Sequence, residues 1–165
     1  ELGYDKPIVL HTHLILGLLK PDVWPLPKEN REEYITTLKM SKSKPDSAVF
    51  IHDSEEEIRR KINNAFAPEG EIEFNPILDW TKHLIFYKPG TGLTVERPNK
   101  WGGSKTYTSY DNLEQDYLSK SLHPQDLKTA VADWLVAKLE PARKYFEDPK
   151  RQAALESIER LTQKK

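Results

Sequence analysis

Lys39-Met40-Ser41-Lys42-Ser43, continued by Lys44-Pro45-Asp46-Ser47, is the most informative stretch of the chain. Lys39 and Lys42 lie three residues apart and alternate with small hydroxyl residues, so two ammonium groups and two hydroxyl donors can face one polyanion. Mobile positive charge of this kind can follow a triphosphate as charge develops on it during a transfer reaction. A solvated loop rich in Lys and Ser is the alternative, and five residues alone do not decide between the two.

The composition predicts a folded domain, or two small ones, with a hydrated surface. Of 165 residues, 37% are hydrophobic and four are Trp, whereas 31% are charged. No apolar run approaches the roughly 20 residues of a membrane-spanning helix, and the first residues lack the pattern of a signal peptide. Absence of Cys excludes disulfides and thiolate metal sites, and it fits a cytoplasmic setting.

The net charge of the chain is -1, so the overall charge does not indicate a nucleic-acid partner. A nucleic-acid surface would therefore have to be a local patch. The first four residues, Glu1-Leu2-Gly3-Tyr4, resemble the end of a helix with a glycine cap, so we expect the chain to be cut from a longer protein.

The apolar run at 7–11 predicts a buried strand of a parallel sheet. His11 and His13 follow at its carboxyl end, where open α/β sheets bind ligands. Two histidines in i, i+2 spacing could hold a metal, but no third ligand lies nearby in the sequence, so we expect no metal site.

From Ser54 onward the pattern is mostly helical. Ser54 is a helix cap with Glu57 in the capping-box position, and Ile58, Ile62 and Phe66 fall on one face. Further caps and prolines predict helices at 76–87, 109–120, Pro124–Phe146 and 149–161, with a perturbation at Pro141.

A hairpin interrupts these helices. Leu93–Val95 and Lys105–Tyr107 predict two short strands that flank a Gly-rich turn carrying Trp101 at its tip. An aromatic ring in this position can stack on an unpaired base, or it can fold back over its own hairpin. Local sequence leaves both open.

His123 and Asp126 lie at the start of the helix that Pro124 opens. The two acceptors of the Asp126 carboxylate suit the two N–H donors on the Watson–Crick edge of guanine. In isolation, however, the pair is better explained as a helix cap and a favourable first-turn acid.

Taken in order, these segments resemble the carboxyl half of an archaeal- or eukaryotic-type tyrosyl-tRNA synthetase of class I. The resemblance is carried by Lys39 to Ser43, the helix from Ser54, Arg97-Pro98 with Lys100-Trp101-Gly102-Gly103, Leu122 to Lys128, and Leu139-Glu140-Pro141. It implies a mainly α fold with a small α/β remnant. Residues 1–53 would end a Rossmann-like catalytic domain, and residues 54–165 would form a helical anticodon-binding domain.

The resemblance also implies roles for individual residues. Lys39 and Lys42 would be catalytic and contact the phosphates of ATP, accompanied by Mg²⁺, within a loop that includes Met40, Ser41 and Ser43. His11 would line the adenosine side of the site. Trp101 would stack on the first anticodon base, Asp126 would pair with that guanine, and His123 would assist.

A complete enzyme of this type would activate L-tyrosine with ATP and transfer it to tRNA(Tyr). We expect a homodimer formed through the missing amino half, and no ligase activity from this chain alone. The alternatives are a standalone tRNA-binding module and a fragment of a tryptophanyl-tRNA synthetase. A purely structural helical domain explains neither the loop nor the hairpin.

Overall fold

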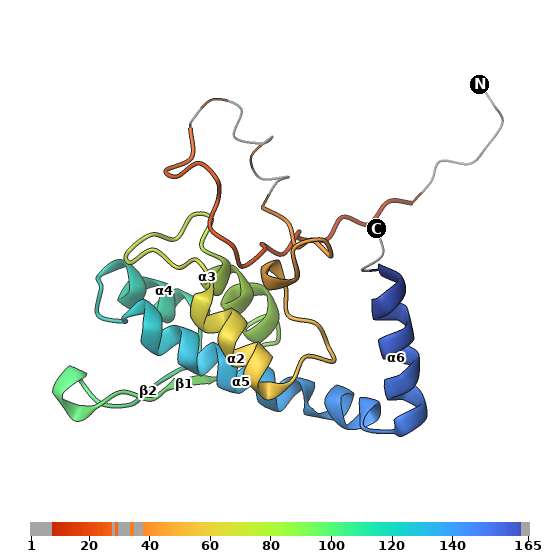
Figure 1. Cartoon of the computed structure of the whole chain (residues 1–165). Helices are drawn as coiled ribbons and strands as arrows, with labels where there is room; N and C mark the ends of the chain where they lie inside the picture. Colours follow the sequence, from red (N-terminus) through yellow and green to blue (C-terminus); the bar gives the residue numbers. More distant parts are fainter. Residues whose placement is uncertain (1–7, 28, 30–33, 35–37, 163–165) are drawn as a thin grey trace.

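The computed structural model describes residues 8–27, 29, 34 and 38–162. This part of the chain is mostly helical with one small sheet, as the sequence predicts (Figure 1). Its elements are η1 (Pro45–Ser47), α2 (Glu55–Asn64), α3 (Pro76–Trp80), the π-helical turn η2 (Thr81–Ile85), β1 (Leu93–Val95), η3 (Asn99–Trp101), β2 (Lys105–Tyr107), α4 (Tyr110–Leu118), α5 (Pro124–Phe146) and α6 (Pro149–Thr162).

The helices begin where their capping residues predict. The hydroxyl of Ser54 accepts the amide N–H of Glu57 at 3.1 Å, and the side chain of Asn75 accepts those of Ile77 and Leu78. The Glu57 carboxylate does take part in a local pair, but its partner is Arg60 on the next turn. α5 continues through Pro141 to Phe146.

The helix predicted at 76–87 forms in two parts. α3 ends at Trp80, and η2 continues it with wider turns, in which the N–H of Phe86 donates to the carbonyl of Thr81. Thr81 is fully buried, and its hydroxyl donates to the carbonyl of Ile77 at 2.7 Å. Such a bond from a side chain back to the preceding turn competes with the regular helical pattern.

The hairpin has the predicted strands. β1 and β2 are antiparallel, with Leu93 opposite Tyr107 and Val95 opposite Lys105. The inward-facing Leu93, Val95 and Tyr107 are buried against the helices, and the turn beyond them projects from the helical body (Figure 1).

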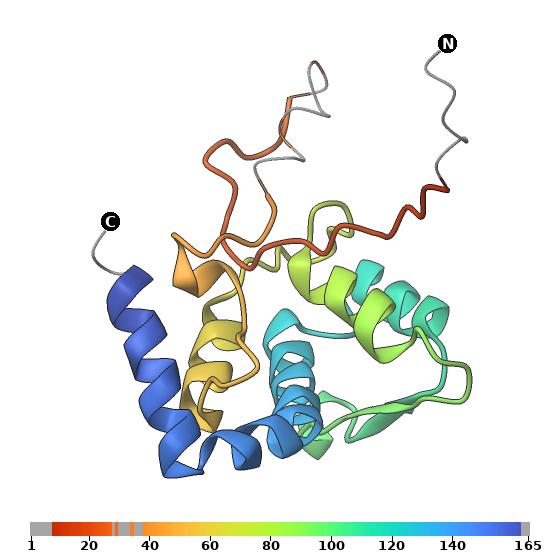
Figure 2. The same cartoon turned by 90° about the vertical axis from the view of Figure 1, so that its right-hand side faces the viewer.

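One hydrophobic cluster joins these elements. It is formed where α2 packs along α5, with α3, α4 and the base of the hairpin around them (Figures 1 and 2). Its fully buried side chains include Leu18, Ile58, Ile62, Ile77, Val95, Tyr107, Leu113, Tyr117 and Leu127. Leu18 therefore ties the amino-terminal segment into the core of the helical part.

The prediction of a buried strand at 7–11 is wrong for residues 8–11. These residues form no strand, and Ile8 is 93% exposed. A parallel strand needs neighbours on its edges and helices on its faces. Within the described ranges the sole sheet is the β1–β2 hairpin, and it lies elsewhere.

Candidate functional site

The Lys39–Ser43 loop packs against the backbone of the segment around Gly17. Leu16 and Lys39 form an antiparallel bridge, and the N–H of Gly17 donates to the carbonyl of Leu38 at 2.6 Å. The contact is so close that a Cβ on Gly17 would lie 3.0–3.1 Å from backbone atoms of Leu38 and Lys39. A side chain at this position would push the two backbones apart by a few tenths of an ångström.

The buried side chain of Ser47 binds the backbone of the loop on its carboxyl-terminal side. Its hydroxyl accepts the N–H of Ser41 at 2.8 Å and donates to the carbonyl of Ser41 at 3.1 Å. The hydroxyls of Ser41 and Ser43 are 2.9 Å apart. The backbone is thus fixed at Ser41, while the lysine side chains on either side of it point outward.

The ammonium groups of the loop are exposed to solvent. Lys39, Lys42 and Lys44 are exposed, and within the described ranges no carboxylate lies at ion-pair distance from any of them. The nearby carboxylate of Asp46 instead accepts from Arg60 at 2.7 Å, and this hydrogen bond holds its pKa below the usual range. Among the residues that the structure describes, none competes with an anionic ligand for these lysines.

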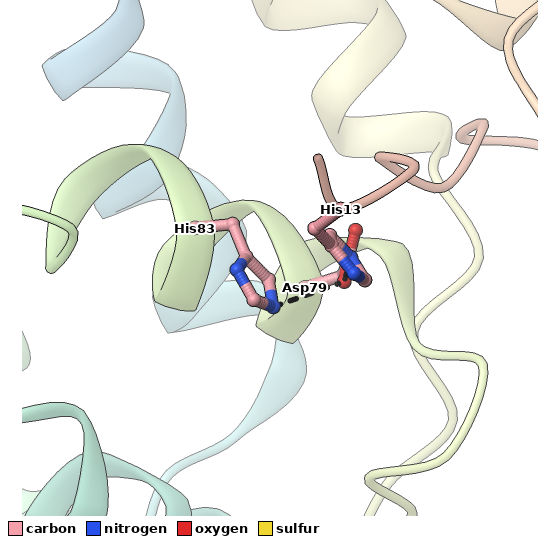
Figure 3. Close-up of side chains that lie close together, drawn as sticks. All are labelled: His13, Asp79 and His83. Atoms are coloured by element: carbon pink, nitrogen blue, oxygen red, sulfur yellow. Dashed lines mark hydrogen bonds and ion pairs between the residues drawn. The ribbon is translucent and has the colours of Figure 1, made fainter. Parts of the chain in front are cut away.

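The amino-terminal segment brings a second group of polar side chains together, and this group is not evident from the sequence. Nε2 of His13 lies 2.6 Å from Oδ1 of Asp79, and the rings of His13 and His83 stack with centroids 3.8 Å apart (Figure 3). Burial and the neighbouring His13 lower the pKa of His83. Asp79 and His83 share the i, i+4 spacing of a helix, but nothing local links them to His13. His11 is exposed on the same segment.

The hairpin presents Trp101 to solvent. The indole is 66% exposed, so the alternative in which it folds over its own hairpin does not occur. Gly102 and Gly103 have φ values of 94° and 69°, which residues with side chains rarely adopt, and they reverse the chain after Trp101. Lys100 places its ammonium group 5.5 Å from the indole centre.

Arg97 links this hairpin tip to the loop before α5, a role that the sequence reasoning did not identify. Its guanidinium donates to the carbonyl of Gly103 at 3.1 Å and to that of Ser121 at 2.7 Å. Because Ser121 lies two residues before His123, Arg97 connects the turn that carries Trp101 to the segment that carries His123 and Asp126.

The start of α5 combines a cap with an accessible acid. Nδ1 of His123 accepts the N–H of Gln125 at 3.1 Å, which confirms His123 as the helix cap. With Nδ1 accepting, the neutral ring presents a donor at Nε2. Asp126 is partly exposed, and the side chains of Gln125 and Lys128 bind Asn63 at the end of α2.

These surfaces are separate. The Lys39–Ser43 loop and the hairpin tip lie on opposite sides of the helical body in both views (Figures 1 and 2). The lysines of the loop and the indole of Trp101 therefore do not belong to one site.

None of the helices in the described ranges is long and apolar enough to cross a membrane.

Comparisons with known proteins agree on one family. The model of the tRNA synthetases class I (W and Y) matches residues 34–140. Tyrosine–tRNA ligase of Thermococcus kodakarensis is 52% identical over 143 residues, which cover 86% of this chain and 38% of that protein. Its counterpart from Aeropyrum pernix is 42% identical over 160 residues, covering 96% of this chain and 44% of the relative.

Comparison with solved structures indicates the same family. Tyrosyl-tRNA synthetase from Pyrococcus horikoshii, crystallised with L-tyrosine, superposes with a TM-score of 0.84 at 50% identity. The match covers 89% of this chain and 40% of that one. The chain thus spans less than half the length of the relatives that it matches.

Proposed function

The chain belongs to the tRNA synthetases of class I (W and Y), and on this basis we propose that it is the carboxyl-terminal part of a tyrosine–tRNA ligase. The observation that carries this proposal is the 52% identity to such ligases over a stretch that includes 86% of the chain. In the complete enzyme, residues 1–53 end a Rossmann-like catalytic domain, and residues 54–165 form the anticodon-binding domain.

The Lys39–Ser43 loop serves the chemistry of tyrosine activation. ATP, with Mg²⁺ on its phosphates, supplies the adenylyl group and the pyrophosphate leaving group. Lys39 and Lys42 fit the phosphates because both are exposed and lack a competing carboxylate among the described residues. They stabilise negative charge as the pyrophosphate departs, while Met40, Ser41 and Ser43 complete the loop and His11 lines the adenosine side. No protein nucleophile is needed, because the tyrosine carboxylate attacks phosphorus.

The hairpin and the start of α5 read the anticodon of tRNA(Tyr). Trp101 stacks on the first anticodon base, Asp126 accepts from the Watson–Crick edge of that guanine, and His123 adds a donor. Exposure of the indole and the Arg97 link between the hairpin tip and Ser121 support this joint pocket. Stacking of a base on an aromatic ring contributes about 1–3 kcal/mol.

The remaining features of the enzyme come from parts that this chain does not include. These are the tyrosine pocket, most of the ATP site and the homodimer interface, so we expect no ligase activity from the chain alone. The complete enzyme would work in the cytoplasm.

Two other functions are less well supported. A standalone tRNA-binding module would use the hairpin but leaves the lysine loop without a purpose. A tryptophanyl-tRNA synthetase shares the family model, but the relatives with 52% identity are tyrosine–tRNA ligases.

The first test is binding of the purified chain to the anticodon stem-loop of tRNA(Tyr), compared with a stem-loop whose first anticodon guanine is replaced. Preference for guanine supports the anticodon pocket. Equal binding, or none, by a chain that melts cooperatively would contradict it.

The loop is tested in the complete ligase. Lys42→Ala should slow tyrosine activation, measured by ATP–pyrophosphate exchange, while leaving tRNA affinity nearly intact. Unchanged activation would remove the phosphate role of Lys42.

A further inference from the structure

None of the three side chains of the His13–Asp79–His83 cluster is used by the proposed function. One nitrogen from each histidine and one oxygen from Asp79 all lie within 4.8 Å of one another. The three residues come from two segments that are far apart in the sequence, namely the amino-terminal segment and the α3–η2 helix (Figure 3). We propose that this cluster binds a divalent zinc ion, which fastens the amino-terminal segment to α3.

The donor set suits zinc. Two imidazole nitrogens and one carboxylate oxygen form a common three-residue ligand set for Zn²⁺, with water in the fourth position. Nitrogen and oxygen ligands lie about 2.0–2.1 Å from zinc, which places ligand atoms of a tetrahedral site about 3.3 Å apart. The corresponding distances here bracket that value: 2.6 Å from Asp79 Oδ1 to His13 Nε2, and 3.8 Å to His83 Nε2.

Coordination requires the stacked rings to rotate, because nearly parallel rings do not direct their in-plane lone pairs at one point. The His13 and His83 side chains are 45% and 33% exposed, so both stacked rings can turn until their lone pairs converge. Zinc on Nε2 of His13 requires the tautomer whose ring proton lies on Nδ1, so the hydrogen bond from His13 to Asp79 is replaced by the two metal–ligand bonds. Because both imidazoles are partly exposed, water can reach the fourth ligand position.

The carboxylate is already oriented by the backbone. Oδ2 of Asp79 accepts the N–H of Leu16 at 2.9 Å, which leaves Oδ1 as the oxygen that faces both histidines. A metal-ligating carboxylate is commonly held in this way by a second hydrogen bond. The indole N–H of Trp80 donates to the carbonyl of Leu16 at 2.7 Å, so the same short segment is fixed on both sides.

A zinc ion here would act on the segment that supports the lysine loop. His13 precedes Leu16 by three residues, and Leu16 pairs with Lys39. Fastening His13 to α3 restricts the backbone against which the Lys39–Ser43 loop rests. This is a structural role, and it does not require ligase activity.

The test is titration of the 165-residue chain with zinc chloride by isothermal calorimetry at neutral pH in a buffer that does not bind metals. We expect one zinc per chain, and an affinity reduced about tenfold or more by His13→Gln or His83→Gln. His11→Gln, which removes a histidine from the same segment but not from the cluster, should retain the affinity. Far-UV circular dichroism checks that each variant is folded.

Cobalt provides a second measurement. Co²⁺ in a tetrahedral site absorbs strongly in the visible range, so the wild-type chain should develop these bands and His83→Gln should not. Wild-type zinc binding that His83→Gln leaves unchanged would overturn the proposal. Equal loss with His11→Gln and His13→Gln would also overturn it, because it would assign the metal to the i, i+2 pair.

Discussion

Trp101 is a large aromatic residue that lies outside the hydrophobic core. Trp101→Ala removes an aromatic surface that touches solvent and not the core, so we expect the chain to keep its stability. Affinity for the tRNA(Tyr) anticodon stem-loop should fall by roughly 1–3 kcal/mol, measured by fluorescence anisotropy. Trp101→Phe is the matched control and should retain most of the affinity. An alanine variant that binds as tightly as wild type would exclude stacking.

Asp126 should contribute selectivity. Asp126→Ala is expected to weaken binding of the guanine-containing stem-loop by roughly 1–3 kcal/mol, because a hydrogen-bonded charge is lost. Asp126→Asn, which replaces one acceptor by a donor, should reduce the preference for guanine without changing the size of the side chain. If both variants discriminate between the two stem-loops as wild type does, Asp126 does not read the base.

Asp116 couples the hairpin base to α4 in a manner that depends on pH. Burial raises its pKa, but hydrogen bonds from Lys105 and Tyr107 outweigh burial and hold the pKa below the ordinary 3.8. The folded state is therefore stabilised by the ionised carboxylate above about pH 4, and this contribution is lost as the pH falls through the lowered pKa.

Urea unfolding between about pH 3 and 6 tests this linkage. Wild type should lose stability more steeply below about pH 4 than Asp116→Asn, which keeps an acceptor for Tyr107 but cannot titrate. Parallel pH profiles for the two proteins would contradict the assignment.

Among the elements, the bridge between Leu16 and Lys39 depends on one glycine. Gly17→Ala would place a methyl group 3.0 Å from the carbonyl oxygen of Leu38, so the two backbones must separate. We expect faster amide hydrogen exchange at Ser41 and Ser47, with little change in α2 and α5. Gly92→Ala, whose added methyl group meets only ordinary contacts of 3.5–3.7 Å, is the control. Unchanged exchange in the Gly17 variant would show that the loop does not rest on this bridge.

At the scale of the whole molecule, a buried ion pair lies beside the hydrophobic core. Nζ of Lys61 in α2 lies 2.6 Å from Oδ2 of Asp53, and the two side chains are only 3% and 9% exposed. Asp53 also accepts the N–H of Phe50 at 2.8 Å. Asp53→Ala leaves a buried ammonium without its partner, so the free energy of unfolding should fall by about 3–5 kcal/mol in urea titrations.

An exposed pair provides the comparison for this change. Arg59 of α2 and Asp133 of α5 form an ion pair at the surface. Asp133→Ala should change stability little, because water screens exposed ion pairs. Equal effects of the two substitutions would mean that burial of the Asp53–Lys61 pair is unimportant.

Local residue patterns were sufficient to predict most of the helices and the hairpin. Ser54, Asn75 and Ser109 each cap the helix that follows, and prolines open α3, α5 and α6. A capping residue or a first-turn proline acts on backbone groups within a few residues, so the helix start that it predicts does not depend on the tertiary structure. The segment at 8–11 failed because a parallel strand is defined by neighbours, and the described chain supplies none.

The sequence by itself determined the family, the capped helices, the hairpin strands and the exposed lysines of the loop, because each depends on adjacent residues. Tertiary structure alone decided which distant groups meet. His13 reaches Asp79 across 66 positions, Arg97 joins Gly103 to Ser121, and Leu18 enters the helical core. Such contacts arise when burial of apolar surface fixes how helices pack, and spacing along the chain does not encode that packing locally.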